Sequence, residues 1–453
     1  MADIKRGGLH RAAKLASLPA GVVGRAALGV GKRMTGKSKD EVNAELLEKA
    51  ADEMFTVLGE LKGGAMKVGQ ALSVMEAAIP PQFADPFREA LVKLQSEAPP
   101  LPAPTLHRVL DGQLGIKWRE RFRSFDDTPV AAASIGQVHK GVWRDGREVA
   151  VKIQYPGADE ALRADLKLIQ RFSWVAKQVV PGADVDRLVA EIHDTMEAEL
   201  DYRREAENQR AFAAAYAGDP KFAVPPVVAS APKVVVSEWM EGRRLSSVIA
   251  QGTRAARDSA AALLIEFTLS SPARVGLVHA DPHPGNFMLL PDGRLGIVDF
   301  GAVAEHPGGV PAGFGELLCW ARDEQWDHVI RLLKELRFMP PSYDLTPEQL
   351  VEYLQPLWPY IDPLRSGEFH FTREWFQKSA IVTADPLADG FGNRFKMARN
   401  LTIPPGYVML LRTLGGLLGV AVQLDATTAY AELIERWVPG FFPPDEPPPP
   451  VLG

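Results

Sequence analysis

The stretch HADPHPGN at residues 279–286, followed by DFG at residues 299–301, decides the fold of this chain. Two further segments precede it, AAASIGQV at residues 131–138 and VAVK at residues 149–152. Each segment alone is weak evidence, because short motifs recur by chance. Their fixed order and spacing carry the signal, since together they supply a lysine, two carboxylates and an amide.

These residue types suit a nucleotide triphosphate and a hard metal ion. Phosphoryl transfer depends on positioning and charge stabilisation more than on covalent catalysis. Lys152 is a cation for the α and β phosphates, and Asp281 is the candidate catalytic carboxylate. Asn286 and Asp299 offer the oxygen ligands that Mg²⁺ prefers. The pattern therefore predicts ATP and Mg²⁺ as cofactors.

The four segments in this order predict an α+β, bilobal protein-kinase-like fold. Val149, Val151 and Ile153 alternate with Ala150 and Lys152, which indicates a strand that carries the lysine. Helical patterns dominate after residue 246. The expected organisation is a basic arm at 1–40, an N-terminal helical extension at 41–125 with a Pro-rich linker at 99–104, an N-lobe at 126–240, a helical C-lobe at 241–440 and a Pro-rich tail at 441–453.

A kinase-like lysine needs a helical carboxylate to hold it. Residues 184–216 have a charged, amphipathic helical pattern that contains EAELDYRRE at 197–205. On a continuous helix Asp201 and Glu205 share a face, whereas Glu199 points about 120° away from Glu205. We therefore predict that Glu205 pairs with Lys152 and assists catalysis by positioning it.

The other expected nucleotide contacts lie on the strands and turns around Lys152. The alanine-rich segment should cover the phosphates, and the small side chain of Ala150 leaves room for adenine. The backbone after the buried strand at 234–236 should bind the adenine edge. The predicted nucleotide-binding residues are Ala131, Ala132, Ala133, Ser134, Ile135, Gly136, Val138, Ala150, Lys152, Glu238, Met240 and Met288.

Two more motifs resemble the UbiB (AarF-type) atypical kinases. KVGQ at 67–70 resembles their KxGQ motif, and ELD at 199–201 resembles their ExD motif. The resemblance covers roughly residues 40–430. It implies a helix folded over the nucleotide site and a regulatory motif made of Lys67, Gly69, Gln70, Glu199 and Asp201, with Lys67 and Gln70 against the two carboxylates.

Two departures from ordinary protein kinases bear on the substrate. The phosphate segment has alanines where glycines would let the backbone approach phosphate closely. Residues 302–313 contain no APE-like segment of the kind that docks a peptide. Both features argue against a conventional protein substrate. The resemblance implies isoprenoid-quinone lipid metabolism, with ATP hydrolysis favoured over protein phosphorylation.

Charge is unevenly distributed along the 453 residues. The net charge is −6, but residues 1–40 hold nine Lys or Arg against two Asp, which leaves −13 on the rest. A basic arm on an acidic body indicates an anionic partner such as a membrane surface, and a solvated tail is the alternative. Nucleic acid is a poor candidate, because no aromatic residues accompany the basic ones.

The single cysteine, Cys319, excludes an internal disulfide and favours a reducing compartment. The apolar stretch 407–424 is interrupted by Arg412 and Gln423, so we expect a buried core helix rather than a membrane span. The predicted location is therefore cytoplasmic, and peripheral at the inner face of the membrane if the basic arm binds there.

The sequence predicts an ATP-binding, Mg²⁺-dependent atypical kinase or ATPase that acts in quinone or prenyl-lipid homeostasis at a membrane surface. Its expected partners are ATP, an anionic membrane, a prenyl-lipid or quinone precursor, and a biosynthetic complex. Three alternatives stay open: a phosphotransferase of the aminoglycoside or choline kinase type, a Ser/Thr protein kinase, and a non-catalytic, ATP-dependent scaffold.

Overall fold

The computed structural model covers most of the predicted N-lobe and C-lobe. It describes residues 100–133, 135–160, 163, 200–354, 358–377 and 403–442. The predictions that fall outside the described residues concern the basic arm, the helical extension up to residue 99, the tail from residue 443, and five site residues: Lys67, Gly69, Gln70, Ser134 and Glu199.

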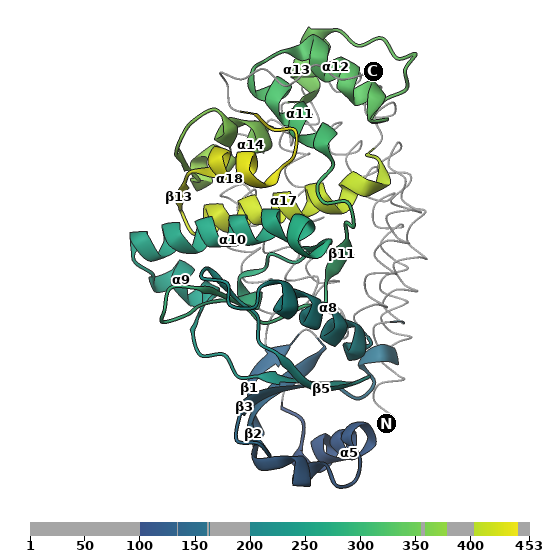
Figure 1. Ribbon diagram of the computed structural model, residues 1–453, viewed down its shortest axis with the longest axis vertical. Coiled ribbons are helices and arrows are strands. Elements are labelled where there is room, and N and C mark those ends of the chain that lie inside the picture. The colour runs from purple at the N-terminus through teal and green to yellow at the C-terminus, as the bar shows by residue number, and fades with distance from the viewer. Residues whose placement is uncertain are drawn as a thin grey trace, which may run out of the picture.

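A five-stranded antiparallel sheet forms the N-lobe (Figure 1). Along the sheet, the order is β1-β2-β3-β6-β5. The strands are β1 (Phe122–Ala133), β2 (Gly136–Trp143), β3 (Glu148–Gln154), β5 (Val227–Ala231) and β6 (Val234–Glu238). The strands predicted at 149–153 and 234–236 are therefore confirmed.

Alternation along β3 gives this sheet two different faces. Val149, Val151 and Ile153 are fully buried in a core that also contains Leu106 and Leu110 of helix α5 (Ala103–Leu114). The residues between them point to the other face, as the period of a strand requires. The prediction of a linker at 99–104 is wrong in part. Helix α5 starts at Ala103 and packs on the sheet, because its apolar residues recur at helical spacing.

Helix α8 (Tyr202–Ala215) covers the second face of the sheet. Tyr202 and Ala206 pack against Val235 of β6 and Ile135 at the start of β2. The helix lies between the sheet and the long helix α10 (Arg254–Val275) in Figure 1. It is therefore placed to present side chains to β3 and to the C-lobe at once.

The C-lobe is mainly helical, as predicted. Thr253 caps α10 by accepting a hydrogen bond from Ala256 N, and Gly276 ends the helix with φ +73°. One large core contains the buried side of α10 and most of the later helices. The other helices are α9 (Leu245–Gln251), α11 (Ala312–Arg322), α12 (Trp326–Glu335), α13 (Pro347–Leu354), α14 (Trp358–Ile361), α17 (Pro405–Gln423) and α18 (Tyr430–Trp437).

Helix α17 contains the apolar stretch that was weighed above as a membrane span. Among the described residues it is the one helix long and apolar enough to cross a membrane, and 56% of its window Gly406–Gln423 is buried. Leu410, Leu414 and Leu418 pack in the C-lobe core. The packing is that of a core helix.

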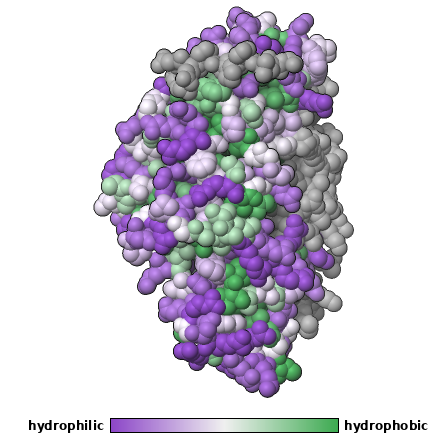
Figure 2. All heavy atoms as spheres, in the orientation of Figure 1, coloured by the Kyte–Doolittle hydropathy of each residue, from purple (hydrophilic) through white to green (hydrophobic). Residues whose placement is uncertain are grey.

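The face seen in Figure 2 is largely hydrophilic where the residues are described. Hydrophobic side chains form small separate groups there rather than one broad patch. The large hydrophobic residues exposed in the described part are Ile116, Val130 and Ile403. Membrane attachment stays a prediction based on residues 1–40.

Candidate active site

The predicted catalytic segment and the predicted metal ligand lie next to each other. Strand β8 (Leu277–His279) leads into a loop that contains Asp281 and then into a 3-10 turn, η3 (Pro284–Asn286). Strands β9 (Phe287–Leu289) and β10 (Leu295–Ile297) follow as an antiparallel pair. Val298 N donates to Asn286 O at 3.0 Å. Asn286, just before β9, and Asp299, just after Val298, therefore lie at the same end of this strand pair.

Side chains within the catalytic loop hold its shape. His283 Nδ1 accepts a hydrogen bond from Gly285 N at 3.1 Å, which caps the turn η3. Asn286 Nδ2 donates to Asp281 O at 3.1 Å. The amide nitrogen of Asn286 is thus turned toward the loop, and its Oδ1 is the atom left for a ligand. His283 therefore has a structural partner in the turn, and His279 has one in the carbonyl of Asp299.

Lys152 is the centre of the candidate site. Its Nζ donates to Glu205 Oε1 at 2.6 Å and to Asp299 Oδ2 at 2.8 Å. The side chains of Lys152 and Glu205 are only 13% and 5% exposed. Burial alone would lower the pKa of Lys152, but the charges of Asp299 and Glu205 outweigh it and raise that pKa well above its ordinary value. Lys152 therefore stays charged at every physiological pH.

The start of α8 differs from the continuous helix assumed from the sequence. The helix begins at Tyr202, and Asp201 is its extended N-cap with φ −110°. Asp201 Oδ1 accepts from Arg203 N at 3.0 Å, and the Arg203 guanidinium lowers the pKa of Asp201. Asp201 and Glu205 thus share no helix face, and the helical-wheel argument for Glu199 loses its basis.

The alanine-rich segment is part of a hairpin rather than an open loop. Ala131, Ala132 and Ala133 belong to β1, and Ala133 is paired with Gly136 of β2. The backbone of the hairpin is therefore paired up to its turn. This pairing sets the position of Gly136 at the start of the second strand.

Gly136 lies against the backbone of β3. A Cβ at this position would clash with Ile153 O and would lie 2.9 Å from the Tyr202 hydroxyl oxygen. We expect Gly136→Ala to destabilise the protein by about 1–3 kcal/mol, as overpacked cores do. Urea unfolding checks this, with Gly112→Ala as control because no atom lies within 4 Å of a Cβ there. Equal stability of the two variants would contradict it.

The side chain of Ile135 packs inside the N-lobe, and a nucleotide contact through its backbone stays a prediction. Its side chain is 5% exposed and packs with Tyr202 and Ala206 of α8. Its carbonyl accepts from Tyr155 N at 2.9 Å. Ile135 therefore fastens the tip of the hairpin to α8, and its side chain is not available to a nucleotide.

The predicted adenine residues lie on strands of both lobes. Val138 and Ala150 share the sheet face of Lys152, because paired residues and alternate residues point the same way. The amide of Glu238 donates to Pro226 O, and the amide of Trp239 donates to Glu148 O, each at 2.9 Å. Met240 Sδ packs against Gly296, whose strand partner is Met288.

The donor set near Lys152 suits a hard cation. Asp299 supplies a carboxylate that is 29% exposed, and Asn286 supplies an amide oxygen. Both donors are oxygen atoms at one end of the β9–β10 pair, which is the chemistry that Mg²⁺ prefers. No cluster of three or more His, Cys, Asp or Glu side chains suited to a metal occurs in the part of the chain that is described. The residues therefore fit a metal shared with phosphate rather than a site closed by protein ligands.

Sequence reasoning missed two residues on α8. The ammonium of Lys152 lies 5.2 Å from the ring centroid of Tyr202. Asn208 Nδ2 donates to the carbonyl of Phe300 at 3.1 Å. Asn208 lies three positions after Glu205 and so on the same side of the helix, but this spacing does not identify Phe300 as its partner.

Comparison with known proteins places the chain in a family. Residues 93–332 match the model of the ABC1 atypical kinase-like domain. Protein ACTIVITY OF BC1 COMPLEX KINASE 3, chloroplastic, from Arabidopsis thaliana is 30% identical over 84% of this chain and 51% of its own length. The atypical kinase COQ8, mitochondrial, from Saccharomyces cerevisiae is 30% identical over 63% of this chain and 57% of its own.

A solved structure agrees with this match. The complex of Rv3197 with erythromycin, from Mycobacterium tuberculosis, has a chain 54% identical to this one, with a TM-score of 0.68. The alignment covers 90% of this chain and 100% of that one. By contrast, the chain spans about half the length of the first curated relatives it matches. The family match extends over more than half of the sequence, and the chain belongs to the ABC1 atypical kinase-like family.

Proposed function

We propose that this protein binds ATP with Mg²⁺ and acts as an atypical kinase or ATPase. The observation that carries the proposal is Lys152 Nζ, held between Glu205 at 2.6 Å and Asp299 at 2.8 Å. A buried lysine with two carboxylate partners supplies a fixed positive charge beside a metal ligand. That arrangement suits the phosphates of a nucleotide, which need charge neutralisation above all.

Each predicted residue takes one role in this proposal. Lys152 binds phosphate oxygens, and Glu205 positions Lys152. Asp281 orients the attacking hydroxyl or water and accepts its proton. Asn286 and Asp299 hold Mg²⁺, which neutralises charge on the phosphates when it is bound. The backbone near Glu238 and Met240 binds the adenine edge.

The segment after Gly301 favours hydrolysis over protein phosphorylation. The chain passes directly through strand β11 (Val303–Glu305) and enters helix α11 at Ala312. Strand β11 pairs with β8, where Val303 lies opposite His279. The described segment between the metal ligand and α11 is therefore short and partly held in a sheet, which leaves little surface for a peptide substrate.

Two classes of second ligand come into question. The resemblance of KVGQ and ELD to the UbiB motifs favours a quinone or prenyl-lipid precursor, with the basic arm as the membrane contact. The erythromycin complex of a 54% identical protein supports a large apolar macrolide as the second candidate. We expect the ligand that binds to change the rate of ATP turnover.

The test is ATP hydrolysis by the full chain with Mg²⁺, alone, with anionic vesicles that carry a prenylquinone-like phenol, and with erythromycin. We expect turnover that one of the two additions increases. Asp281→Asn should reduce it at least about a hundredfold while Mg-ATP binding persists, as expected on loss of a general base. Tight Mg-ATP binding without turnover in any condition would overturn the enzyme proposal in favour of the scaffold, and absent binding would overturn both.

A further inference from the structure

The backbone around Asp299 is held by side chains from two other elements. His279 Nε2 of β8 donates to Asp299 O at 2.7 Å. Asn208 Nδ2 of α8 donates to the next carbonyl, that of Phe300, at 3.1 Å. We propose that Asn208 is a positioning residue that sets the orientation of the Asp299 carboxylate for Mg²⁺. This inference rests on the proposed function and adds a residue to it.

Lys152 Nζ holds Oδ2 of the Asp299 carboxylate, and the backbone of its own segment holds Oδ1. Asp299 Oδ1 accepts from Gly301 N at 2.9 Å, within the same short segment. Ala280 N donates to Ala302 O at 3.0 Å, which fixes the far end of the segment. A rotation of the peptide group between Phe300 and Gly301 would therefore move the amide that holds Oδ1. The bond from Asn208 to Phe300 O opposes this rotation directly.

Helix α8 links this segment to Lys152. Glu205 and Asn208 are three residues apart on α8, so they lie on one side of the helix. Glu205 holds Lys152, and Asn208 holds the residue after Asp299. Helix α8 thereby holds both Lys152, the expected phosphate cation, and the backbone beside Asp299, the expected metal ligand. The distance between these two groups is therefore set by the helix rather than by the loops.

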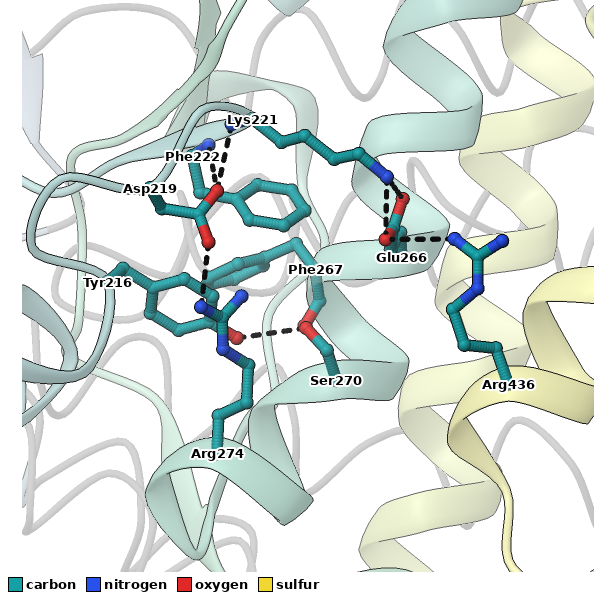
Figure 3. A network of polar contacts seen from close by, with 9 residues as sticks. All are labelled: Tyr216, Asp219, Lys221, Phe222, Glu266, Phe267, Ser270, Arg274 and Arg436. Carbon is teal, nitrogen blue, oxygen red and sulfur yellow. Dashed lines mark hydrogen bonds and ion pairs between the residues drawn. The ribbon is translucent and has the colours of Figure 1, made fainter.

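The end of α8 is fastened to the C-lobe independently of Asn208 (Figure 3). The hydroxyl groups of Tyr216 and Ser270 are 3.0 Å apart, and Arg274 pairs with Asp219 at 2.7 Å. Lys221 pairs with Glu266 at 2.7 Å on the other side of this network. Loss of the Asn208 side chain should therefore leave the helix in place and free only the segment after Asp299.

The chain offers a matched control one residue further along the helix. Gln209 is buried, and its Nε2 donates to Pro225 O at 2.6 Å. Asn208→Ala and Gln209→Ala thus each remove one amide-to-carbonyl hydrogen bond from α8. The two carbonyls differ in place: that of Phe300 adjoins the expected metal ligand, whereas that of Pro225 precedes strand β5.

The experiment measures Mg²⁺-dependent ATP binding by titration calorimetry for the wild type and both variants of the full chain. Asn208→Ala should weaken the Mg²⁺ dependence about 10- to 100-fold, the usual effect of losing a partner outside the metal's own ligands. Gln209→Ala should leave it within about twofold of the wild type. Hydrogen exchange of the segment 298–302 supplies a readout that needs no activity, and it should accelerate in Asn208→Ala alone.

The outcomes separate this inference from the proposed function. If the wild type shows no Mg²⁺-dependent binding, the proposed function fails first. If the wild type binds and the two variants behave alike in both measurements, Asn208 is merely structural and the inference is overturned. Asn208→Asp keeps the size of the side chain and removes the donor, so it should behave like Asn208→Ala rather than like the wild type.

Discussion

Replacing Lys152 by Met is expected to reduce ATP turnover at least about a hundredfold and to destabilise the protein by about 3 kcal/mol. The first effect follows from losing a fixed charge aimed at the phosphates. The second follows because Glu205, only 5% exposed, would lose the cation that offsets the cost of burying its carboxylate. Urea unfolding followed by circular dichroism measures the stability, and a coupled phosphate assay measures the turnover.

A second substitution separates the two effects. Lys152→Met with Glu205→Gln removes the buried charge along with its partner, so most of the lost stability should return. Turnover should stay as low as in Lys152→Met, because the phosphate cation is still absent. If the double variant were as unstable as the single one, the cost would come from packing around Lys152 rather than from its charges.

Much of the N-lobe could be predicted because the period of its strands is visible in the sequence. Val149, Val151 and Ile153 are completely buried, and Lys152 lies on the opposite face as the alternation requires. The contact of Lys152 with Glu205 could be predicted because the lysine of a kinase-like fold needs a helical carboxylate to hold it. Local spacing and chemistry were sufficient for these features.

The features that sequence reasoning missed depend on contacts that spacing does not encode. Asp201 lies in a charged segment whose pattern predicts one continuous helix, yet its side chain accepts from Arg203 N and caps the start of α8. Ile135 stands in a segment expected to face phosphate, but packing against Tyr202 and Ala206 decides its direction. Asn208 lies 92 residues from the carbonyl that it holds, so no local pattern identifies that partner.

Replacing Asp299 by Asn is expected to weaken Mg²⁺-dependent ATP binding by more than about a hundredfold. The change keeps the shape but leaves one acceptor oxygen for Gly301 N and Lys152 Nζ, and it removes the negative charge that a divalent cation requires. Loss of a direct metal ligand should weaken binding more than loss of a residue that only holds such a ligand, which costs about 10- to 100-fold in affinity. Titration calorimetry with and without Mg²⁺ measures the difference.

The control for Asp299→Asn is Asp292→Asn in the turn between β9 and β10. Asp292 is exposed and pairs with Arg294 at 2.7 Å, so its change removes the same charge at a distance from Lys152. If both variants lost Mg²⁺-dependent binding equally, the effect would come from net charge and not from ligation. Binding kept in both variants would mean that Asp299 serves mainly as the second anion for Lys152 and that Mg²⁺ is held elsewhere. Loss of Mg²⁺-dependent binding in Asp299→Asn alone would show that the Asp299 carboxylate binds the metal. That carboxylate is positioned by Lys152, by Gly301 N and by the backbone that Asn208 holds.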